Sequence, residues 1–436
     1  MKNARLIVAE ALLKLERREA WSNLTLDRAL EYYTLKPEEA ALAAALFYGV
    51  IERRITLDAC IAAHSAKKPE KLDGAVLCAL RLGVYQILYM NSIPHSAAVD
   101  ESVKIVKKLR KTQASGYVNG VLRSFLRGGA VIPLPQKPLS ARLSVEFSCP
   151  QPLVESWLSS YGEEAVRRFL SGSIGPAPSA LRVNTLRTSP EELAKRLEQE
   201  GVAAAPHPHI PGCLMVRGGA LHKTKAFGAG LFHLQDPASQ LCALALEVSP
   251  GMRVLDACAA PGGKSFTLAQ QMENQGELVA CDLHAKRVGL IQKRAREMGL
   301  DCITPQSRDM TEFDPELGTF DRVLCDVPCS GYGVIRRKPE IKYKSLEDFT
   351  DITNIQYKIL ETTAQYCKAG GVLIYSTCTL NPAENGGVRE RFLAAHPEFS
   401  PRPLGGLLGE DSQHTLMGEW DADGFYLAAF TRREEP

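Results

Sequence analysis

Two cysteines in the last third of the chain are the residues best suited to chemistry. Cys329 lies in DVPCSG and Cys378 lies in YSTCTL, and each follows an apolar stretch typical of a buried parallel strand. Because the carboxyl ends of parallel strands line the ligand crevice of an open α/β sheet, we expect both thiols to face one site. A thiolate is a strong nucleophile, so two thiols in one site indicate covalent chemistry with a separate task for each.

The loop after the first strand of the same region predicts a nucleoside-type cofactor. DACAAPGGKS runs from Asp256 to Ser265, and Gly262 and Gly263 let the backbone come close to a ligand. The helix that follows offers free N–H groups at its N-terminus. A P-loop would need glycine where Cys258 stands, and the dinucleotide pattern G-x-G-x-x-G is absent. The cofactor is therefore expected to bind without a phosphate cradle of the Walker type.

Two aspartates follow the next predicted strands. Asp282 comes about 20 residues after the glycines, where an acid can hydrogen-bond a ribose diol. Asp309, in SRDM, is placed to reach an adenine amino group. Either aspartate alone is also compatible with a helix cap. Together with the glycine loop they favour S-adenosyl-L-methionine as the cofactor.

The other cysteines predict neither disulfides nor a metal site. The chain has 12 cysteines in 436 residues, no secretion signal and no C-x-x-C pair. Cys325 and Cys329 form only a C-x-x-x-C pair without comparable partners, so we expect no structural metal. The cysteines expected to be small buried core residues are Cys242, Cys281, Cys302, Cys325 and Cys367.

The elements that must position these residues fall into distinct parts of the chain. Residues 1–130 carry apolar residues at helical spacing and predict an all-α domain, followed by a Gly- and Pro-rich linker at 131–144. Residues 145–235 mix helices with short strands, including a helix capped by Ser189, and indicate a small α+β module. In residues 236–436 apolar strands alternate with amphipathic helices, which predicts a parallel, doubly wound, Rossmann-like α/β domain.

Composition and charge limit the partners and the compartment. The net charge is +2, but residues 1–130 hold 20 Lys and Arg against 13 Asp and Glu, and the remaining residues hold 32 against 37. The basic first part favours a polyanionic partner, although solvated helix faces would give the same composition. The N-terminus lacks the apolar core of a signal peptide, and no apolar run reaches the roughly 18 residues of a membrane span. We expect a cytoplasmic protein with no membrane partner, and a monomer as the default.

Three motifs resemble the RNA 5-methylcytosine methyltransferases of the RsmB/NOP2/Sun family. They are CAAPGGKS, DVPCSGYGVIRRKPEIK and YSTCTLNPAEN. The likeness covers roughly 145–434 and includes QDPASQ and the closing DGFYLAAF. The N-terminal sequences ALFYGVIERR, HSAAVDESVKIVKK and GYVNGVLR resemble a NusB-type helical RNA-binding domain. The combination is similar to family members that modify a cytosine of small-subunit (16S) ribosomal RNA.

The resemblance implies a task for each catalytic residue. Cys378 would be the thiol that adds to carbon-6 of cytosine, which makes carbon-5 nucleophilic toward a methyl group. Cys329 would assist removal of the carbon-5 proton and release of the RNA. Asp326 would hydrogen-bond the edge of the cytosine ring and approach the cofactor. DVPC replaces the Asn/Asp-Pro-Pro-aromatic loop of amino-directed methyltransferases, which favours carbon over an exocyclic nitrogen.

The resemblance also implies the contacts to cofactor and RNA. The residues expected to bind the cofactor are Cys258, Ala259, Ala260, Pro261, Gly262, Gly263, Lys264, Asp282, Asp309 and Asp326. Lys264 would contact either the methionine part of the cofactor or the catalytic site. The run Arg336–Lys338 suits an RNA phosphate or the target base, and an ordinary surface run is the alternative.

The expected partner is 16S ribosomal RNA, with the target cytosine unstacked in a loop or single-stranded region. Two other functions fit the same sequence: a cytosine-carbon-5 methyltransferase of transfer RNA, and a catalytically silent RNA-binding factor of ribosome assembly. The presence of both cysteines and an intact glycine loop counts against the silent factor. The NusB-like domain favours the ribosomal target over transfer RNA.

Overall fold

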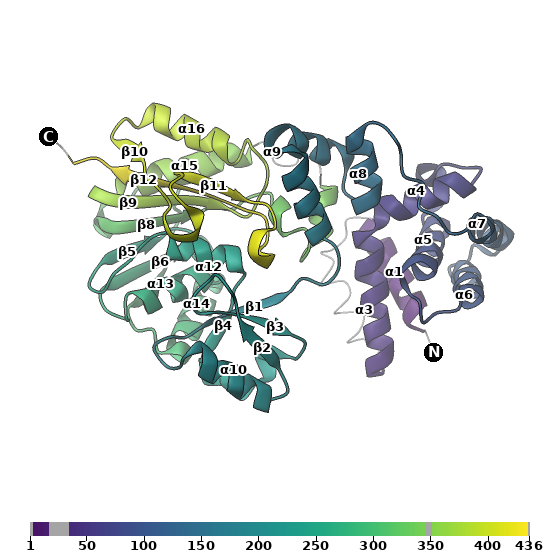
Figure 1. The fold of residues 1–436 in the computed structure, drawn as a ribbon, viewed down its shortest axis with the longest axis horizontal. Coiled ribbons are helices and arrows are strands. Elements are labelled where there is room, and N and C mark those ends of the chain that lie inside the picture. Colours follow the sequence, from purple (N-terminus) through teal and green to yellow (C-terminus); the bar gives the residue numbers. More distant parts are fainter. Residues whose placement is uncertain (1–2, 17–34, 345–350, 435–436) are drawn as a thin grey trace. The chain divides into compact units, whose positions relative to one another are not determined.

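The computed structural model describes residues 3–16, 35–344 and 351–434, and the chain forms two compact units (Figure 1). One unit comprises Met1–Gly175 together with Ile335–Lys344, and the other comprises Pro176–Val334 and Ser345–Pro436. This division is coarser than the one expected from the sequence, so the boundaries at residues 130, 144 and 235 stay predictions. Among the described residues, no helix combines the length and the apolar character that crossing a membrane requires.

The first unit is helical, as the spacing of its apolar residues predicts. Its helices are α1 (Ala4–Glu16), α3 (Pro37–Glu52), α4 (Arg54–His64), α5 (Gly74–Tyr89), α6 (His95–Lys108), α7 (Ser115–Arg127), α8 (Leu139–Phe147) and α9 (Gln151–Gly172). The centre is α5, whose side chains are buried along nearly its whole length. The Asp73 carboxylate accepts the N–H of Ala75 and so satisfies one of the free donors at the start of this helix.

A segment from much later in the chain completes the helical unit. The Tyr343 hydroxyl donates to the carbonyl of Ile51 over 2.7 Å, and the guanidinium carbon of Arg54 lies 3.6 Å from the centre of the Tyr343 ring. Lys342 Nζ donates to the carbonyl of Glu52 over 2.7 Å, and burial lowers the pKa of Lys342 to about 8. The late segment is thus held by main-chain carbonyls at the end of α3.

A small antiparallel sheet opens the second unit, in the order β2-β3-β1-β4. Its elements are β1 (Ser179–Val183), α10 (Pro190–Gln199), β2 (Ala203–Pro206), β3 (Cys213–Arg217) and β4 (Phe232–Leu234). The predicted helix start is confirmed, because the Ser189 hydroxyl accepts the N–H of Glu192 over 3.2 Å. Leu193 and Leu197 of α10 pack in one apolar cluster with the strands. The chain leaves β4 directly into residues that line the candidate site.

An eight-stranded sheet forms the centre of the second unit, in the order β10-β12-β9-β8-β5-β6-β7, with β11 paired to β12. Its strands are β5 (Arg253–Asp256), β6 (Glu277–Asp282), β7 (Ile303–Ser307), β8 (Phe320–Asp326), β9 (Cys367–Thr377), β10 (Phe399–Pro401), β11 (Gln413–Leu416) and β12 (Phe425–Arg432). The first five strands are parallel neighbours, as predicted. The prediction of a wholly parallel sheet is wrong for the last three strands, which pair antiparallel. The short connection from β11 to β12 has no room for the crossover that a parallel pair needs.

Helices cover both faces of this sheet (Figure 1). They are α12 (Pro237–Leu244), α13 (Gly263–Gln271), α14 (Ala285–Met298), α15 (Ile352–Gln365) and α16 (Gly386–Ala395). Successive strand residues point to opposite faces, so Val254 packs in the cluster with α12, α13 and α14, whereas Leu255 packs in the cluster with α15 and α16. Burial on both faces fixes the register of the strands, and with it the positions of the loops that leave their carboxyl ends.

Candidate active site

The two loop cysteines leave the sheet from neighbouring parallel strands. Asp326, the last residue of β8, pairs in register with Ser376 of β9, and the N–H of Val327 donates to the Ser376 carbonyl over 3.1 Å. Cys329 and Cys378 follow a few residues later, and their sulfurs are 3.0 Å apart. The two thiols therefore lie together just beyond the carboxyl ends of neighbouring strands, as the sequence predicts.

The surroundings of the two thiols separate them from the other cysteines of the chain. Nine of the 12 cysteines are buried, and Cys258, Cys329 and Cys378 are half-buried. All five predicted core cysteines are among the buried ones. The hydrogen bond with Cys378 and burial raise the pKa of the Cys329 thiol well above its usual value. Cys329 therefore keeps its proton at neutral pH.

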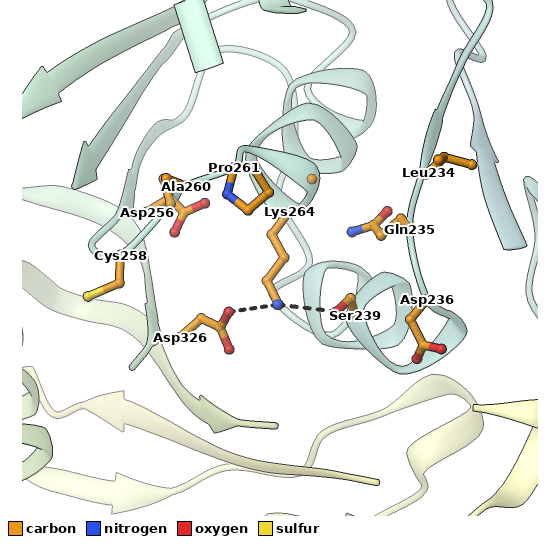
Figure 2. Close-up of a pocket in the computed structure, with 12 residues that line it drawn as sticks. Leu234, Gln235, Asp236, Ser239, Asp256, Cys258, Ala260, Pro261, Lys264 and Asp326 are labelled. Atoms are coloured by element: carbon orange, nitrogen blue, oxygen red, sulfur yellow. Dashed lines mark hydrogen bonds and ion pairs between the residues drawn. The ribbon is translucent and has the colours of Figure 1, made fainter. Parts of the chain in front are cut away.

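An ion pair lies where the Cys329 loop begins, at the end of β8. Lys264 Nζ lies 2.7 Å from Asp326 Oδ2 and 3.4 Å from Ser239 Oγ (Figure 2). Burial opposes the charge on Lys264, but the carboxylate of Asp326 outweighs it and raises the pKa of Lys264 above its usual value. The other carboxylate oxygen of Asp326 accepts the Ser376 hydroxyl over 2.8 Å. Both side chains are thereby fixed in direction.

The glycine loop begins α13 with a backbone that only glycine tolerates well. Gly262 has φ 107°, and a Cβ atom there would lie 2.5 Å from the ring of Phe266. The N–H of Ala259 donates to the carbonyl of Cys281 over 2.7 Å, which ties the loop to the end of β6. The loop is therefore set by two neighbouring strands and by the helix that it starts.

A pocket of about 210 Å³ lies against this loop (Figure 2). Predicted cofactor residues supply more than half of its lining: Cys258, Ala259, Ala260, Pro261, Gly263, Lys264 and Asp326. Five lining residues were not predicted from the sequence: Leu234, Gln235, Asp236, Ser239 and Asp256. QDPASQ supplies three of these five, and its likeness to the family was the one available signal.

The unassigned lining residues include a buried acid and a buried amide. Burial raises the pKa of Asp256 to about 7, and the Ser265 hydroxyl donates to its carboxylate over 2.6 Å. The oxygen of the Gln235 side chain accepts the hydroxyl of Thr267 over 2.7 Å, while its amide nitrogen has no hydrogen-bond partner among the described residues. That nitrogen has almost no exposed surface.

Three predicted cofactor residues, Gly262, Asp282 and Asp309, lie outside the pocket lining. The Asp282 carboxylate is buried at the end of β6, where it accepts the N–H of His284 over 3.0 Å and pairs with Arg287. Asp309 is exposed, and its carboxylate accepts both the N–H and the hydroxyl of Thr311, which lowers the pKa of Asp309. Their cofactor roles stay predictions. The run Arg336–Lys338 belongs to the helical unit, so its role toward RNA also stays a prediction.

Comparisons with protein families match three successive parts of the chain. The 16S rRNA methyltransferase RsmB/F model matches residues 243–431, and the NusB family model matches residues 2–127. The model of the RsmF/B-like, ferredoxin-like domain matches residues 149–220. These matches agree with the predicted order of a helical domain, a small module and a methyltransferase domain.

Relatives match over almost the full length. The probable ribosomal RNA small subunit methyltransferase B of Bacillus subtilis is 38% identical over 400 residues, covering 91% of this chain and 89% of the relative. The ribosomal RNA small subunit methyltransferase B of Thermus thermophilus is 35% identical over 435 residues, covering 98% of this chain and 97% of the relative.

Solved structures share the fold. PH0851 is 25% identical with a TM-score of 0.77, and the match covers 99% of each chain. A methyltransferase homolog from Pyrococcus horikoshii is also 25% identical, with a TM-score of 0.58, covering 68% of this chain and 100% of that one. With the paired thiols and the pocket, these likenesses show that the chain belongs to the RsmB/F family of 16S rRNA methyltransferases and carries its NusB-like and ferredoxin-like domains.

Proposed function

We propose that the protein methylates carbon-5 of a cytosine in 16S ribosomal RNA, with S-adenosyl-L-methionine as the methyl donor and a covalent cysteine–cytosine adduct as the intermediate. The observation that carries the proposal is the 3.0 Å separation of Cys329 Sγ and Cys378 Sγ at the ends of neighbouring strands. The adjoining pocket includes Asp326, three residues before Cys329. A nucleophile and a proton-holding thiol thus lie together beside a pocket for a small cofactor.

The pocket residues fit this cofactor. S-adenosyl-L-methionine supplies an electrophilic methyl group on a cationic sulfonium, and it also carries an ammonium group and a carboxylate. Asp236 and Asp326 offer carboxylates to the cationic groups. The backbone at Gly263, at the start of α13, presents the free N–H groups of a helix N-terminus.

Cys378 acts as the nucleophile in this proposal. Its thiolate adds to carbon-6 of the cytosine, which breaks the conjugation of the ring and gives carbon-5 the character of an enamine carbon. Carbon-5 then takes the methyl group, and the electron pair of the broken carbon–sulfur bond stays with the donor. The product at this stage is a cytosine joined to Cys378 at carbon-6, with a methyl group and a proton on carbon-5.

Cys329 acts in the second half of the reaction. Removal of the carbon-5 proton restores the double bond between carbon-5 and carbon-6 and expels the Cys378 thiolate. Cys329 lies 3.0 Å from that sulfur, and its raised pKa suits a group that carries a proton at neutral pH. Cys329 takes the carbon-5 proton as its own proton passes to the departing Cys378 sulfur. The Cys378 thiol then loses that proton to solvent, which restores the thiolate.

Asp326 orients the base in this scheme. Its two carboxylate oxygens already accept from Lys264 and Ser376, and each oxygen retains a second lone pair for the amino edge of cytosine. Lys264 therefore acts next to the catalytic site by holding Asp326. Since the ring must enter between two loops, the target cytosine is unstacked before reaction.

The test is a methylation assay on 16S ribosomal RNA with a labelled methyl donor. Cys378→Ala should abolish incorporation of the labelled methyl group, because it removes the sulfur that adds to carbon-6 of the cytosine. Cys302→Ala, a change at a buried core cysteine, is the matched control and should retain incorporation. Bisulfite sequencing of 16S RNA from cells lacking the protein should show one fewer protected cytosine. Full turnover by Cys378→Ala would refute the nucleophile assignment, and preferential methylation of transfer RNA would refute the substrate assignment.

A further inference from the structure

A buried carboxylate lies behind the two cysteine loops, outside the pocket. Glu384, in the NPAEN motif between β9 and α16, has no exposed surface. Its Oε2 accepts the N–H of Ser330 over 3.0 Å and the side-chain amide of Gln356 over 2.8 Å. Its Oε1 accepts the side-chain amide of Asn381 over 2.9 Å. One side chain therefore receives three N–H donors, and one of them is the main chain next to Cys329.

The same network holds the other side of Cys329. Gln356, itself fully buried on α15, donates to the carbonyl of Pro328 over 2.9 Å as well as to Glu384. Pro328 and Ser330 are the two neighbours of Cys329 in the chain. The thiol is thus carried by a loop whose main chain is fixed immediately before and immediately after it.

The Cys378 loop is held in the same way by the next residue, Asn385. Its side-chain oxygen accepts the hydroxyl of Thr377 over 2.7 Å, and its amide donates to the carbonyl of Thr379 over 3.0 Å. Thr377 and Thr379 flank Cys378. The hydroxyls of Ser330 and Thr379 join the two loops directly at 2.7 Å.

We propose that Glu384 and Asn385 are positioning residues that set the distance between the two catalytic thiols. Each fixes the main chain of one cysteine loop. Because the two residues are adjacent in the sequence, the two loops are held at a fixed separation from each other. Buried hydrogen bonds to a carboxylate hold their donors in a defined direction. Leaving a buried polar group without a partner costs several times the free energy that a hydrogen bond at the surface contributes. The negative charge of Glu384 also adds to the effects of Cys378 and burial that raise the pKa of the Cys329 thiol.

The direct test measures the thiol separation without any need for activity. Diamide, an azo oxidant, converts two adjacent thiols to a disulfide: the two sulfurs bond, and the two hydrogens reduce the N=N bond to a hydrazine. In the wild type, sulfurs 3.0 Å apart should cross-link rapidly, seen by mass spectrometry as a joined peptide containing Cys329 and Cys378. Glu384→Ala should slow this cross-link by about tenfold or more, since the Ser330 main chain loses its acceptor.

The second readout rests on the proposed function. Glu384→Ala should lower kcat by about 100-fold, as misplacement of a reacting group by about 1 Å does, and should leave KM for the methyl donor unchanged because Glu384 lies outside the pocket lining. Glu384→Gln retains one acceptor oxygen and the volume, so it should recover much of both rates. It also serves as the test variant if the alanine variant does not fold.

The matched control is Asn184→Ala. Asn184 is also fully buried and donates to two main-chain carbonyls, those of Gly230 and Met298, but it touches neither cysteine loop. It should lower thermal stability while leaving the cross-linking rate as in the wild type. A wild-type cross-linking rate in a folded Glu384 variant would overturn the positioning role. Absence of methylation in every variant, wild type included, with slower cross-linking in the Glu384 variants would instead refute the proposed function alone.

Discussion

The two thiols of the site differ although their sulfurs lie 3.0 Å apart. Cys329 holds its proton because its hydrogen bond with Cys378 and its burial raise its pKa. Cys329 therefore brings an S–H group within hydrogen-bonding distance of the Cys378 sulfur. This asymmetry matches a division in which one sulfur attacks and the other handles protons.

The role of Cys329 in release is open to a direct experiment. Cys329→Ala should let the adduct of RNA with Cys378 accumulate, because removal of the carbon-5 proton loses its assisting group. Turnover should fall by about 100-fold or more, the usual contribution of a proton-transfer group. The adduct should be visible as a slower band on a denaturing gel. Normal turnover without any adduct would contradict the assignment, and the double variant lacking Cys378 as well is the control that should give no band.

Asp256 should make stability depend on pH. Burial raises its pKa from the usual 3.8 to about 7, so the folded chain keeps a proton that the unfolded chain has released. Stability should therefore fall as pH rises from about 4 to about 7, by at most about 1.4 kcal/mol per pH unit. Asp256→Asn cannot titrate, and its melting temperature relative to the wild type should rise across this window.

Asp309 provides a control, because its contribution to stability should depend on pH in the opposite direction. Hydrogen bonds from Thr311 lower the pKa of the exposed Asp309, so its stabilising contribution is present above the usual carboxyl pKa and is lost as pH falls. The melting temperature of Asp309→Asn relative to the wild type should improve toward low pH. Parallel pH profiles for the two variants would show that the burial of Asp256 has no effect on its titration.

Residues that belong to one continuous motif could be predicted from the sequence. Cys378 and the glycine loop belong to continuous segments, and strand ends placed them correctly. Gln235 escaped prediction because its unpartnered amide arises only where the residues after β4 meet α13. The spacing also could not reveal that Thr311 donates twice to one carboxylate oxygen of Asp309, whose cofactor role stays a prediction.

At the scale of elements, strand pairing determines where the chemistry lies. The parallel register of Asp326 with Ser376 brings the two cysteine loops out of the same edge. Apolar runs and flanking helices were sufficient to predict β5 to β9. The antiparallel edge was missed because neither pattern nor propensity shows which neighbour a strand pairs with. The short connection between β11 and β12 makes that pair antiparallel.

The glycine loop gives a prediction at this scale. Gly262→Ala places a methyl group 2.5 Å from Phe266 in a backbone with φ 107°, so the start of α13 must shift. Strain of this kind costs on the order of 1–3 kcal/mol, and the affinity for S-adenosyl-L-methionine measured by calorimetry should fall by about tenfold or more. Gly251→Ala has a similar φ but open space around it, and it should bind the cofactor as the wild type does. Equal affinities in the two variants would contradict a role of the loop shape.

At the scale of the whole molecule, the helical unit depends on residues from the far half of the chain. Tyr343→Ala removes a ring that lies under Arg54 and a hydroxyl bonded to the Ile51 carbonyl. The loss should destabilise the end of α3 by on the order of 2 kcal/mol, or about 30-fold faster amide exchange there. Hydrogen exchange followed by mass spectrometry measures it, and peptides from β5 and β6 serve as the internal control.

Tyr343→Phe separates the two contributions, because it keeps the ring and removes only the hydroxyl. It should give a smaller increase in exchange than the alanine variant. Unchanged amide exchange at α3 in both variants would mean that the segment adds nothing to the stability of the helical unit.

The same contacts explain why deleting residues 1–130 is a poor test of RNA binding. The deletion would remove the hydrogen-bond partners of Lys342 and Tyr343 and leave apolar surface exposed.

The late segment also sets an order of events during synthesis. The polypeptide crosses between the units at Gly175, again at Val334 and a third time at Lys344. Domains of most proteins fold from the N-terminus as the ribosome releases them. Here the helices of the first unit leave the ribosome well before the residues that finish their packing. The N-terminal unit therefore completes its fold only after β5 to β8 of the second unit have been synthesised, so an arrested chain ending before Tyr343 carries an unfinished NusB-like domain.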